Sequence, residues 1–296
     1  MGEPGTVSNS GHVVLLGHTG FVGRALQAYL ERAGVIVHGF SSSTLDLRQQ
    51  QSLAVLDDVL TADATLVFAS ALTPERGATL DALAANFAMS VNVARYLETH
   101  PPALCVYVSS DAVYALGDDV VTESTPADPT NVYALAKFNG ERVLQVVADA
   151  RKIPLLIVRP TGVFGPGDTH NSYGPNRFIR SIADNHSVRL FGQGEETRDH
   201  IYVNDLARAI AELMGAGQTG VFNIATGTSR TFGSIVEQLA RLVPFEFELI
   251  EAPRAGPITH RRFDTSRLRT ALPGLNFTPF EDALATTVRS ALAVAR

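Results

Sequence analysis

The sequence predicts an α/β protein, a doubly wound parallel sheet followed by a smaller C-terminal α/β lobe. Short runs rich in Val, Ile and Leu alternate with longer segments of helical period from residue 12 to about residue 160. The runs are apolar throughout, which is typical of strands covered on both faces, and their alternation with helices favours a parallel sheet. After residue 160 the chain becomes rich in Gly, Pro and Asn, which indicates a long loop leading into a second region.

The elements of the first region follow from these runs in order. We expect strands at residues 12–16, 35–40, 64–70, 104–109 and 153–158, and helices at residues 21–34, 48–60, 80–100 and 131–150. Gly34 stands where a helix takes its C-terminal cap, and two prolines end the helix near residue 100. Right-handed crossovers should connect the strands.

The second region has a mixed pattern. We expect helices near residues 176–184, 231–242 and 280–294, and strands near residues 188–192 and 245–250. The run at residues 220–225 is interpreted as a strand that rejoins the main sheet. These elements predict a first domain over residues 12–165, rejoined by about residues 200–225, and a second lobe over residues 166–199 and 226–296.

Composition limits the classes of partner. The formal net charge is −6 and there is no run rich in Lys or Arg, so neither nucleic acid nor an anionic membrane is an expected partner. The one cysteine, Cys105, lies in an apolar run, which fits a reducing cytoplasm. Residues 1–11 lack a secretory signal pattern and are interpreted as a flexible tail, and no stretch approaches the ~20 apolar residues of a membrane span. The eight histidines show no metal-ligand spacing, so no metal is expected.

Three glycines, Gly17, Gly20 and Gly23, lie directly between the first strand and the first helix. Glycines at such a turn let the backbone approach a pyrophosphate, and the helix N-terminus offers N–H groups and a partial positive charge. A tight turn that needs positive φ would explain any single glycine, but all three at this junction favour a Rossmann-like, dinucleotide-binding first domain.

The stretch "LGHTGFVG" resembles the TGxxGFxG loop of the extended short-chain dehydrogenases/reductases, the NAD-dependent epimerase/dehydratase family that modifies nucleotide sugars. Leu16 replaces the usual threonine, which should be tolerable because the backbone carries the phosphate contact. The resemblance covers roughly residues 12–290. It implies that the second region is a substrate-binding lobe, that the protein is a homodimer, and that the dinucleotide is lined by Gly17, Thr19, Gly20, Phe21, Val22, Gly23, Ser41, Ser42, Asp46, Leu47, Ala69, Ser70, Ala71, Asn86, Tyr133, Lys137, Pro160 and Val163.

The choice between NAD and NADP depends on the end of the second strand. An NAD-selective fold places Asp or Glu there to bind the ribose 2′-hydroxyl, but Gly39 stands at that position, followed by Ser41 and Ser42. Hydroxyls can hydrogen-bond a 2′-phosphate without repelling it. An arginine that would fix NADP is missing unless Arg24 or Arg48 reaches in, so NADP is favoured only slightly over NAD.

Tyr133 and Lys137 are spaced i and i+4 in the fourth expected helix, hence on one face. A cation beside a tyrosine stabilises its phenolate, so this pair can move a proton to or from a carbonyl or an alcohol. An isolated Y-x-x-x-K is often a surface pair. Together with Ser110, which follows the fourth strand, it resembles the catalytic Ser/Thr–Tyr–Lys triad of the family, with Ser109 the structural neighbour.

The step from Asp111 to Ala112 separates the subfamilies that the resemblance implies. In 4,6-dehydratases an Asp-Glu pair follows the catalytic hydroxyl, whereas in 4-keto-6-deoxysugar reductases an apolar residue follows the aspartate, as here. The lack of a second carboxylate argues against dehydration. Asp111 is equally well interpreted as a turn residue or as a substrate contact.

The second lobe resembles epimerases over residues 159–205, where the R-D-x-x-x-V-x-D pattern begins at Arg198. The resemblance implies that Arg198 contacts a nucleotide diphosphate, for which a fork of donors is suited. Arg177, Arg261 and Arg262 are weaker substrate-binding candidates. Asp199 is expected to be structural, and Asp205 is a candidate helix N-cap.

The sequence therefore predicts an NAD(P)-dependent oxidoreductase acting on a nucleotide-diphosphate sugar. Reduction of a 4-keto-6-deoxysugar, with Tyr133 as general acid, is the first hypothesis. A 4-epimerase with tightly held NAD is the alternative, and a cofactor-binding protein without catalysis is a third hypothesis, against which the intact triad argues.

Overall fold

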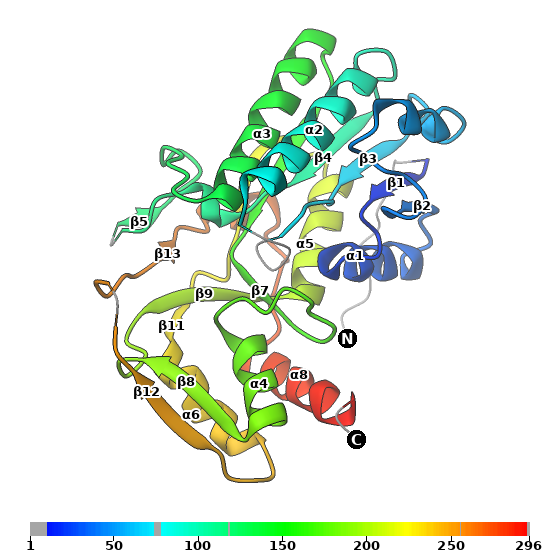
Figure 1. The fold of residues 1–296 in the computed structure, drawn as a ribbon. Coiled ribbons are helices and arrows are strands. Elements are labelled where there is room, and N and C mark those ends of the chain that lie inside the picture. The colour runs from blue at the N-terminus through cyan, green and yellow to red at the C-terminus, as the bar shows by residue number, and fades with distance from the viewer. Residues whose placement is uncertain (1–10, 74–77, 118, 255, 295–296) are drawn as a thin grey trace.

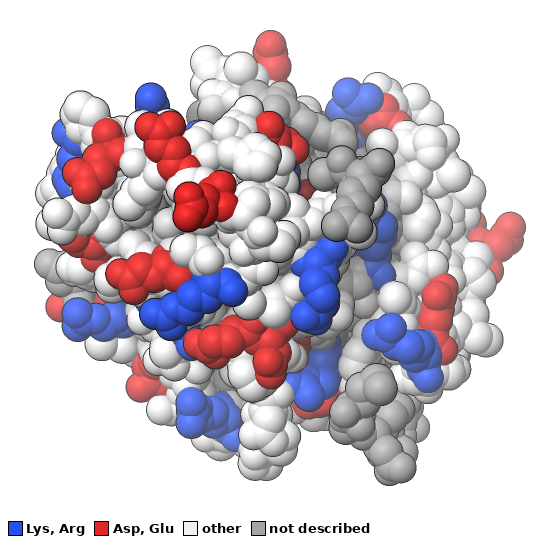
Figure 2. Space-filling model, turned by 90° about the horizontal axis from the view of Figure 1, so that it is seen from below, with Lys and Arg blue, Asp and Glu red and all other residues white. Residues whose placement is uncertain are grey.

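The computed structural model describes residues 11–73, 78–117, 119–254 and 256–294. The tail expected at residues 1–11 therefore lies almost wholly outside the described residues. Two bodies are stacked in Figure 1, a larger sheet-and-helix domain above and a smaller lobe below. On the face seen from below, basic and acidic side chains are interspersed (Figure 2).

The upper domain is built on a six-stranded parallel sheet, in the order β10-β6-β4-β3-β1-β2. The strands are β1 (Val13–Leu16), β2 (Val37–Phe40), β3 (Thr65–Phe68), β4 (Leu104–Val108), β6 (Leu155–Pro160) and β10 (Gly220–Ile224). The doubly wound parallel sheet is thus confirmed, including the late return of β10. The winding reverses between β1 and β3, where such folds bind ligands at the carboxyl ends of the strands.

Helices cover both faces of this sheet (Figure 1). On one face α1 (Phe21–Arg32) packs against α5 (Val203–Gly215), and on the other α2 (Leu80–Leu97) packs against α3 (Val132–Arg151). Leu26 and Ile210 are fully buried in the first core, and Val93 and Leu144 are buried in the second. Each such side chain contributes roughly 1.5–3 kcal/mol of burial free energy. The segment 48–60, expected as an α-helix, forms a 3₁₀ helix, η1, at Gln50–Leu56 instead.

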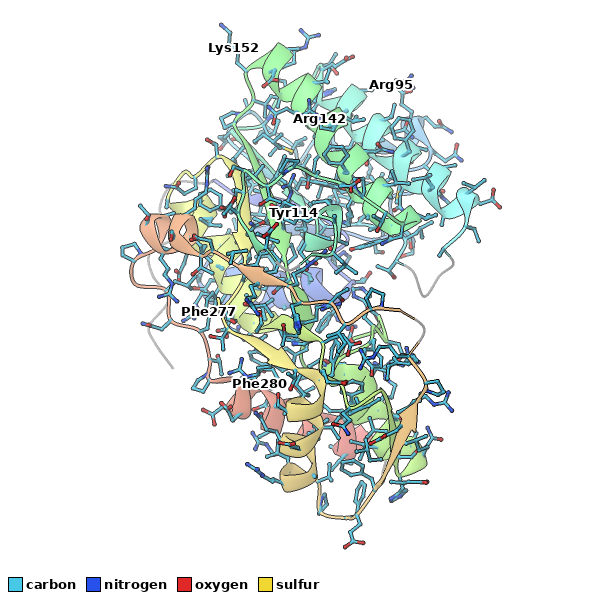
Figure 3. All side chains as sticks on the ribbon, turned by 90° about the vertical axis from the view of Figure 1, so that its left-hand side faces the viewer. Arg95, Tyr114, Arg142, Lys152, Phe277 and Phe280 are labelled. Carbon is cyan, nitrogen blue, oxygen red and sulfur yellow. The ribbon has the colours of Figure 1, made fainter. Side chains whose placement is uncertain are left out.

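The ends of this domain face different surroundings. In Figure 3, Arg95 and Lys152 lie near the end of α2 and α3 that points away from the lobe and Arg142 lies midway along α3, whereas Tyr114 lies inside the domain. Tyr114 follows the short 3₁₀ helix η3 (Asp111–Val113) that continues β4. The carboxyl ends of the strands therefore open toward the lobe.

The lower lobe combines helices α4 (Pro175–Asn185), α6 (Phe232–Leu242) and α8 (Phe280–Val294) with paired strands β8 (Ser187–Phe191) and β12 (Glu248–Ala252). Its core is aromatic, with Phe164, Phe178, Phe232 and Phe280 buried together. The expected elements of the lobe are therefore present, and the strand expected near residues 245–250 lies slightly later, at β12.

Three small features connect the two bodies. A three-stranded sheet, β11-β9-β7, joins β7 (Gly162–Phe164), β9 (Thr197–Tyr202) and β11 (Ser229–Thr231), and a two-stranded pair joins β5 (Val120–Val121) to β13 (Arg262–Phe263). Helix α7 (Ser266–Ala271), which was not predicted and lies in a segment assigned to the lobe, places Leu268 in the core of the upper domain. The lobe is thus tied to the sheet domain at several points.

Candidate active site

A cavity of about 630 Å³ lies at the carboxyl ends of β1, β3, β4 and β6. Both the glycine loop and the Tyr-Lys helix contribute to its wall. Of the sequence-predicted residues, those that line it are Gly17, Thr19, Gly20, Phe21, Val22, Gly23, Ser41, Ser42, Asp46, Leu47, Ala69, Ser70, Ala71, Ser110, Asp111, Tyr133, Lys137, Pro160 and Val163. Segments far apart in sequence therefore converge on one site.

The glycine loop has the geometry that a pyrophosphate requires. Gly17 has φ +94°, and a Cβ there would lie 2.8 Å from Ser70 Oγ. A Cβ on Gly23 would collide with the carbonyl oxygen of Gly17, so α1 can start this close to β1 only if residue 23 has no side chain. Gly20 is the N-cap of α1, and residues 20–23 line the cavity, so the N-terminus of this helix lies at the cavity wall. The residues present fit a dinucleotide.

Ser110, Tyr133 and Lys137 come together on one wall of the cavity. Ser110 is the N-cap of η3, and its Oγ accepts a hydrogen bond from the Ala112 N–H at 3.1 Å. Tyr133 lies in the first turn of α3, whose N-cap Asn131 accepts from the Ala134 N–H. The Lys137 Nζ lies 5.9 Å from the centre of the Tyr133 ring.

Lys137 is buried and donates a hydrogen bond to the Val108 carbonyl at 2.7 Å. Burial lowers the pKa of Lys137 to about 8, and the negative charge of Glu141 opposes that shift. A buried ammonium beside Tyr133 stabilises negative charge on the tyrosine oxygen.

A buried polar network that the sequence analysis missed supports the triad from behind. Ser109 Oγ donates to Glu141 Oε1 at 2.5 Å, and Arg159 Nε donates to the same oxygen at 2.8 Å. Arg159 Nη1 also donates to Tyr114 Oη, which donates to Asn223 Oδ1. The i,i+4 spacing of Lys137 and Glu141 was the available signal, together with an arginine in an otherwise apolar strand. Ser109 thus holds α3 against β4, as a structural neighbour of Ser110 would.

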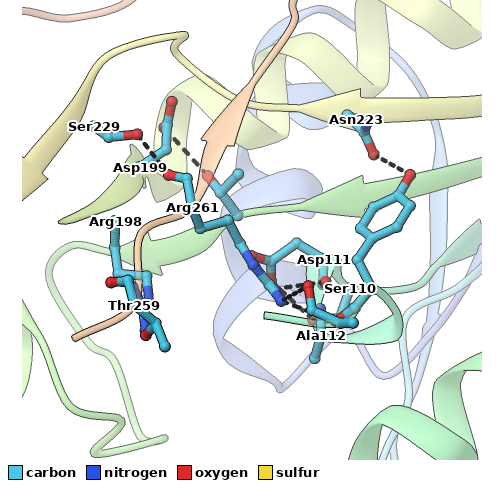
Figure 4. Close-up of polar contacts among 12 residues, drawn as sticks. Ser110, Asp111, Ala112, Arg198, Asp199, Asn223, Ser229, Thr259 and Arg261 are labelled. Atoms are coloured by element: carbon cyan, nitrogen blue, oxygen red, sulfur yellow. Dashed lines mark hydrogen bonds and ion pairs between the residues drawn. The ribbon is translucent and has the colours of Figure 1, made fainter. Parts of the chain in front are cut away.

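Asp111 is paired with Arg261, whose backbone carbonyl is hydrogen-bonded to Ser229 of β11 (Figure 4). The two side chains are 3.1 Å apart, Nη1 to Oδ2, and the Arg261 side chain is only 7% exposed. Arg262, the neighbour that the sequence analysis named as a substrate contact, is exposed on β13 and does not line the cavity. Of these two neighbouring arginines, Arg261 is therefore the one that contacts Asp111, although its side chain is not among the residues that line the cavity.

Three other sequence-predicted residues lie outside the wall of the main cavity. Asn86 accepts from the Leu72 N–H and donates to the Leu72 carbonyl, so it fixes the loop after β3, beside a small adjoining cavity. Arg198 donates to the Thr259 carbonyl and hydroxyl, both at 2.8 Å, and Arg177 is exposed and lies over the ring of Tyr173. These side chains are held by protein groups in this structure.

The two aspartates of the R-D-x-x-x-V-x-D pattern have structural partners. Asp199 is buried and accepts hydrogen bonds from the backbone N–H groups of residues 226–228, which fix the turn between β10 and β11. The N-cap prediction for Asp205 is wrong, because Tyr202 is the N-cap of α5. Asp205 instead accepts from the N–H and hydroxyl of Thr278, which fixes the segment before α8.

His200, on β9, is a wall residue that sequence reasoning missed. It lines the cavity with its ring packed among Phe164, Phe232 and Phe280, and its Nδ1 is buried without a hydrogen-bond partner. Burial, followed by the charges of Arg198 and Arg230, lowers the pKa of His200 to about 3. The imidazole is therefore neutral at physiological pH.

Two negative observations apply to the part of the chain that the structure describes. Within it, no three His, Cys, Asp or Glu side chains are grouped as metal ligands would be. Nor does any helix there have the length and apolar character needed to cross a membrane.

Known proteins resemble this chain in sequence over part of its length. Human dTDP-D-glucose 4,6-dehydratase is 31% identical over 140 residues, which are 47% of this chain and 40% of that protein. UDP-glucose 4-epimerase of Mycolicibacterium smegmatis is 30% identical over 156 residues, 51% of this chain and 50% of that protein. The chain thus matches half or less of the length of these relatives.

Solved structures resemble it over nearly the whole fold. RMD from Pseudomonas aeruginosa, complexed with NADPH, superposes with a TM-score of 0.83 at 23% identity, over 95% of this chain and 99% of that one. UDP-glucose 4-epimerase of Thermus thermophilus, in complex with NAD, gives 0.84 at 19% identity, over 95% and 98%. The family model described as "NAD dependent epimerase/dehydratase family" matches residues 13–225. The expected family is confirmed: this chain belongs to the NAD-dependent epimerase/dehydratase family, the extended short-chain dehydrogenases/reductases.

Proposed function

We propose that the protein is an NAD(P)-dependent oxidoreductase that reduces a nucleotide-diphosphate 4-keto-6-deoxysugar. The observation that carries the proposal is the convergence of Ser110, Tyr133 and Lys137 on a cavity walled by the glycine loop. A nicotinamide dinucleotide supplies the hydride when it is bound there. The family membership and the nucleotide sugars named for its relatives support the substrate class.

The protein residues would handle the proton and the oxygen. Ser110 and Tyr133 hydrogen-bond the carbonyl oxygen of the sugar, and Tyr133 gives its proton to that oxygen as negative charge develops. Lys137 stabilises the resulting tyrosinate through its buried ammonium. The buried pair of Glu141 and Arg159 holds α3 and β6 in place behind this wall.

Dehydration is disfavoured by two observations, although the curated relatives include 4,6-dehydratases. Ala112 provides no second acid or base after Asp111. The carboxylate of Asp111 is itself engaged by the guanidinium of Arg261. Elimination of water would need one group to take a proton and another to give one, and this turn lacks that pair.

A 4-epimerase is the second candidate, favoured by the match to the mycobacterial UDP-glucose 4-epimerase. The two functions differ in stoichiometry. A reductase oxidises one reduced cofactor per sugar, whereas an epimerase shows no net consumption and should purify with cofactor bound. The test is to add NADH or NADPH with several nucleotide-bound 4-keto-6-deoxysugars and follow absorbance. If the purified protein never oxidises either cofactor, the reductase proposal is wrong.

The cofactor preference can be tested in the same assay, and we propose a slight preference for NADP. A Cβ at Gly39 would lie 2.6 Å from His18 Cγ, so the side chain of His18 occupies the space of the carboxylate that NAD-selective folds place here. Ser41 and Ser42 line the cavity instead, and Arg48 is paired with Asp46. The preference predicts a lower KM for NADPH than for NADH. An equal or higher KM for NADPH would overturn it.

We also propose that the protein is a homodimer that acts in the cytoplasm. Leu80 and Phe87 on α2, and Leu135 and Val146 on α3, are exposed apolar side chains on two helices that pack together. A second copy could cover them, in line with the family resemblance. Light scattering should give twice the chain mass, and Val146→Glu should lower it. The burial of Cys105 fits a reducing compartment.

A further inference from the structure

Figure 4 shows the side chain of Arg261 extending from a backbone position beside Ser229 to Asp111, in the turn that carries Ser110. Its Nη1 donates to the Asp111 carbonyl at 2.8 Å and to Asp111 Oδ2 at 3.1 Å. Its Nη2 donates to the Tyr114 and Ala115 carbonyls at 2.8 and 3.0 Å. One side chain therefore bonds both ends of the turn formed by residues 110–115.

The backbone of Arg261 is anchored on the three-stranded sheet that connects the two bodies. Its N–H donates to the Thr197 carbonyl at 3.0 Å, and its own carbonyl accepts from Ser229 Oγ at 2.7 Å. Thr197 and Ser229 belong to β9 and β11, which are next to each other in the three-stranded sheet. Arg261 thus transmits the position of that sheet to the catalytic turn, 150 residues away in sequence.

The contact bears directly on the hydroxyl of Ser110. Ser110 Oγ lies 3.4 Å from Asp111 Oδ1, which is long for a hydrogen bond to a carboxylate, while Arg261 holds the other oxygen, Oδ2. Without Arg261, the carboxylate of Asp111 would be a strong hydrogen-bond acceptor next to Ser110. It would compete with the substrate oxygen for the hydroxyl hydrogen of Ser110.

We propose that Arg261 is the positioning residue of this site. It fixes the turn of residues 110–115 and restrains Asp111, so that the Ser110 hydroxyl is available to the sugar oxygen. Arg261 touches neither the reacting atoms nor the cofactor in this account. The kinetic part of the proposal rests on the proposed function, whereas the structural part does not.

The test compares Arg261→Gln with Arg262→Gln, a matched variant of the exposed neighbouring arginine. Hydrogen–deuterium exchange should report the turn directly, because the N–H groups of Ala112, Val113 and Tyr114 are bonded within it. We expect exchange in a peptide spanning residues 110–116 to accelerate at least about tenfold in Arg261→Gln, with the core of the lobe unchanged. Arg262→Gln should exchange as the wild type does.

Kinetics provide the second readout. With a 4-keto sugar nucleotide that the wild type reduces, Arg261→Gln should lower kcat about 10²-fold through misplacement of Ser110. The KM and the cofactor Kd should stay within about threefold. The proposal would be overturned if Arg261→Gln raised KM and left kcat unchanged. It would also be overturned if the turn exchanged at the wild-type rate, or if exchange were faster throughout the chain.

Two further comparisons distinguish failure of this proposal from misfolding of the variant and from failure of the proposed function. Where Arg261→Gln does not fold, Arg261→Lys replaces it. An ammonium has three N–H donors and cannot replace the four hydrogen bonds of the guanidinium, so the turn should still exchange faster than in the wild type. Wild-type exchange in the lysine variant contradicts the proposal. If the wild type reduces no sugar nucleotide, the proposed function fails, and the exchange comparison alone still decides the role of Arg261.

Discussion

At the scale of single residues, Tyr133 is the group on which the proposed chemistry depends most. Tyr133→Phe removes one hydroxyl from the cavity wall and leaves the glycine loop intact, so kcat should fall by about 10²–10⁴-fold with little change in cofactor Kd. Fluorescence titration of the reduced cofactor and steady-state kinetics measure both quantities. Tyr96→Phe is the matched control, because the Tyr96 hydroxyl bonds Asp57 away from the cavity.

The comparison of wild type and Tyr133→Phe also tests the hypothesis that the protein binds cofactor without catalysis. If Tyr133→Phe keeps full turnover, the tyrosine is not the proton donor. If neither protein turns over any sugar nucleotide while both bind cofactor, a cofactor-binding role without catalysis becomes the better account.

Deprotonation of Lys137 should set the upper pH at which the site is active. Burial lowers its pKa to about 8, so the ammonium that faces Tyr133 is present below that pH and is lost above it. Glu141, the other charged group facing it along α3, opposes the shift. We expect kcat to be level below about pH 7 and to fall about tenfold per unit above pH 8. A pH–rate profile that stays level to pH 10 would contradict this role for the cation.

At the scale of elements, the glycine loop joins β1 to α1 so closely that there is no room for a side chain at position 23. A Cβ at Gly23 would collide with the Gly17 carbonyl oxygen, so Gly23→Ala must move α1 away from β1. We expect a loss of about 1–3 kcal/mol of unfolding free energy and weaker cofactor binding. Urea unfolding and cofactor titration are the measurements.

Gly274 provides the control position for the Gly23→Ala substitution. It is exposed, and a Cβ there would meet no atom within 4 Å. Gly274→Ala should change the unfolding free energy by less than about 0.5 kcal/mol and leave cofactor binding unaltered. Equal effects of the two alanines would mean that close approach is not the reason for glycine at position 23.

The same elements show what the sequence could predict. Strands β1, β2, β3, β4 and β6 and the return of β10 were predictable because each lies in a largely apolar run, a property of consecutive residues. The glycine loop and the Tyr133–Lys137 pair were predictable for the same reason. Segment 50–56 was not, because an amphipathic stretch this short has the same pattern in an α-helix and a 3₁₀ helix.

Contacts between segments that are distant in sequence could not be predicted. Nothing in the pattern around Arg261 and Arg262 indicates which of the two reaches the turn 150 residues earlier in sequence, and Arg261 is the one. The same holds for Arg198, whose guanidinium is bonded by Thr259 on a loop that the sequence left undefined. Asp205 was expected to cap its own helix, but its partner, Thr278, comes from 73 residues away.

At the scale of the whole molecule, the two bodies enclose the cavity together, and the sheet that connects them supplies a buried histidine, His200, to its wall. Because the pKa of His200 is lowered to about 3, the folded protein keeps this imidazole neutral between pH 3 and 6.5, where an unfolded chain would protonate it. The unfolded state then binds the extra proton. The unfolding free energy should therefore fall as pH falls through this range, by about 1.4 kcal/mol per pH unit from this residue alone.

His200→Phe tests that contribution in an environment that suits the replacement, since Phe164, Phe232 and Phe280 already surround the ring. Urea unfolding at pH 7, 6, 5 and 4 should show a shallower loss of unfolding free energy in the variant than in the wild type. Equal slopes in the wild type and His200→Phe would show that His200 is protonated in the folded protein, and that the cavity wall is wetter or more mobile than its packing indicates.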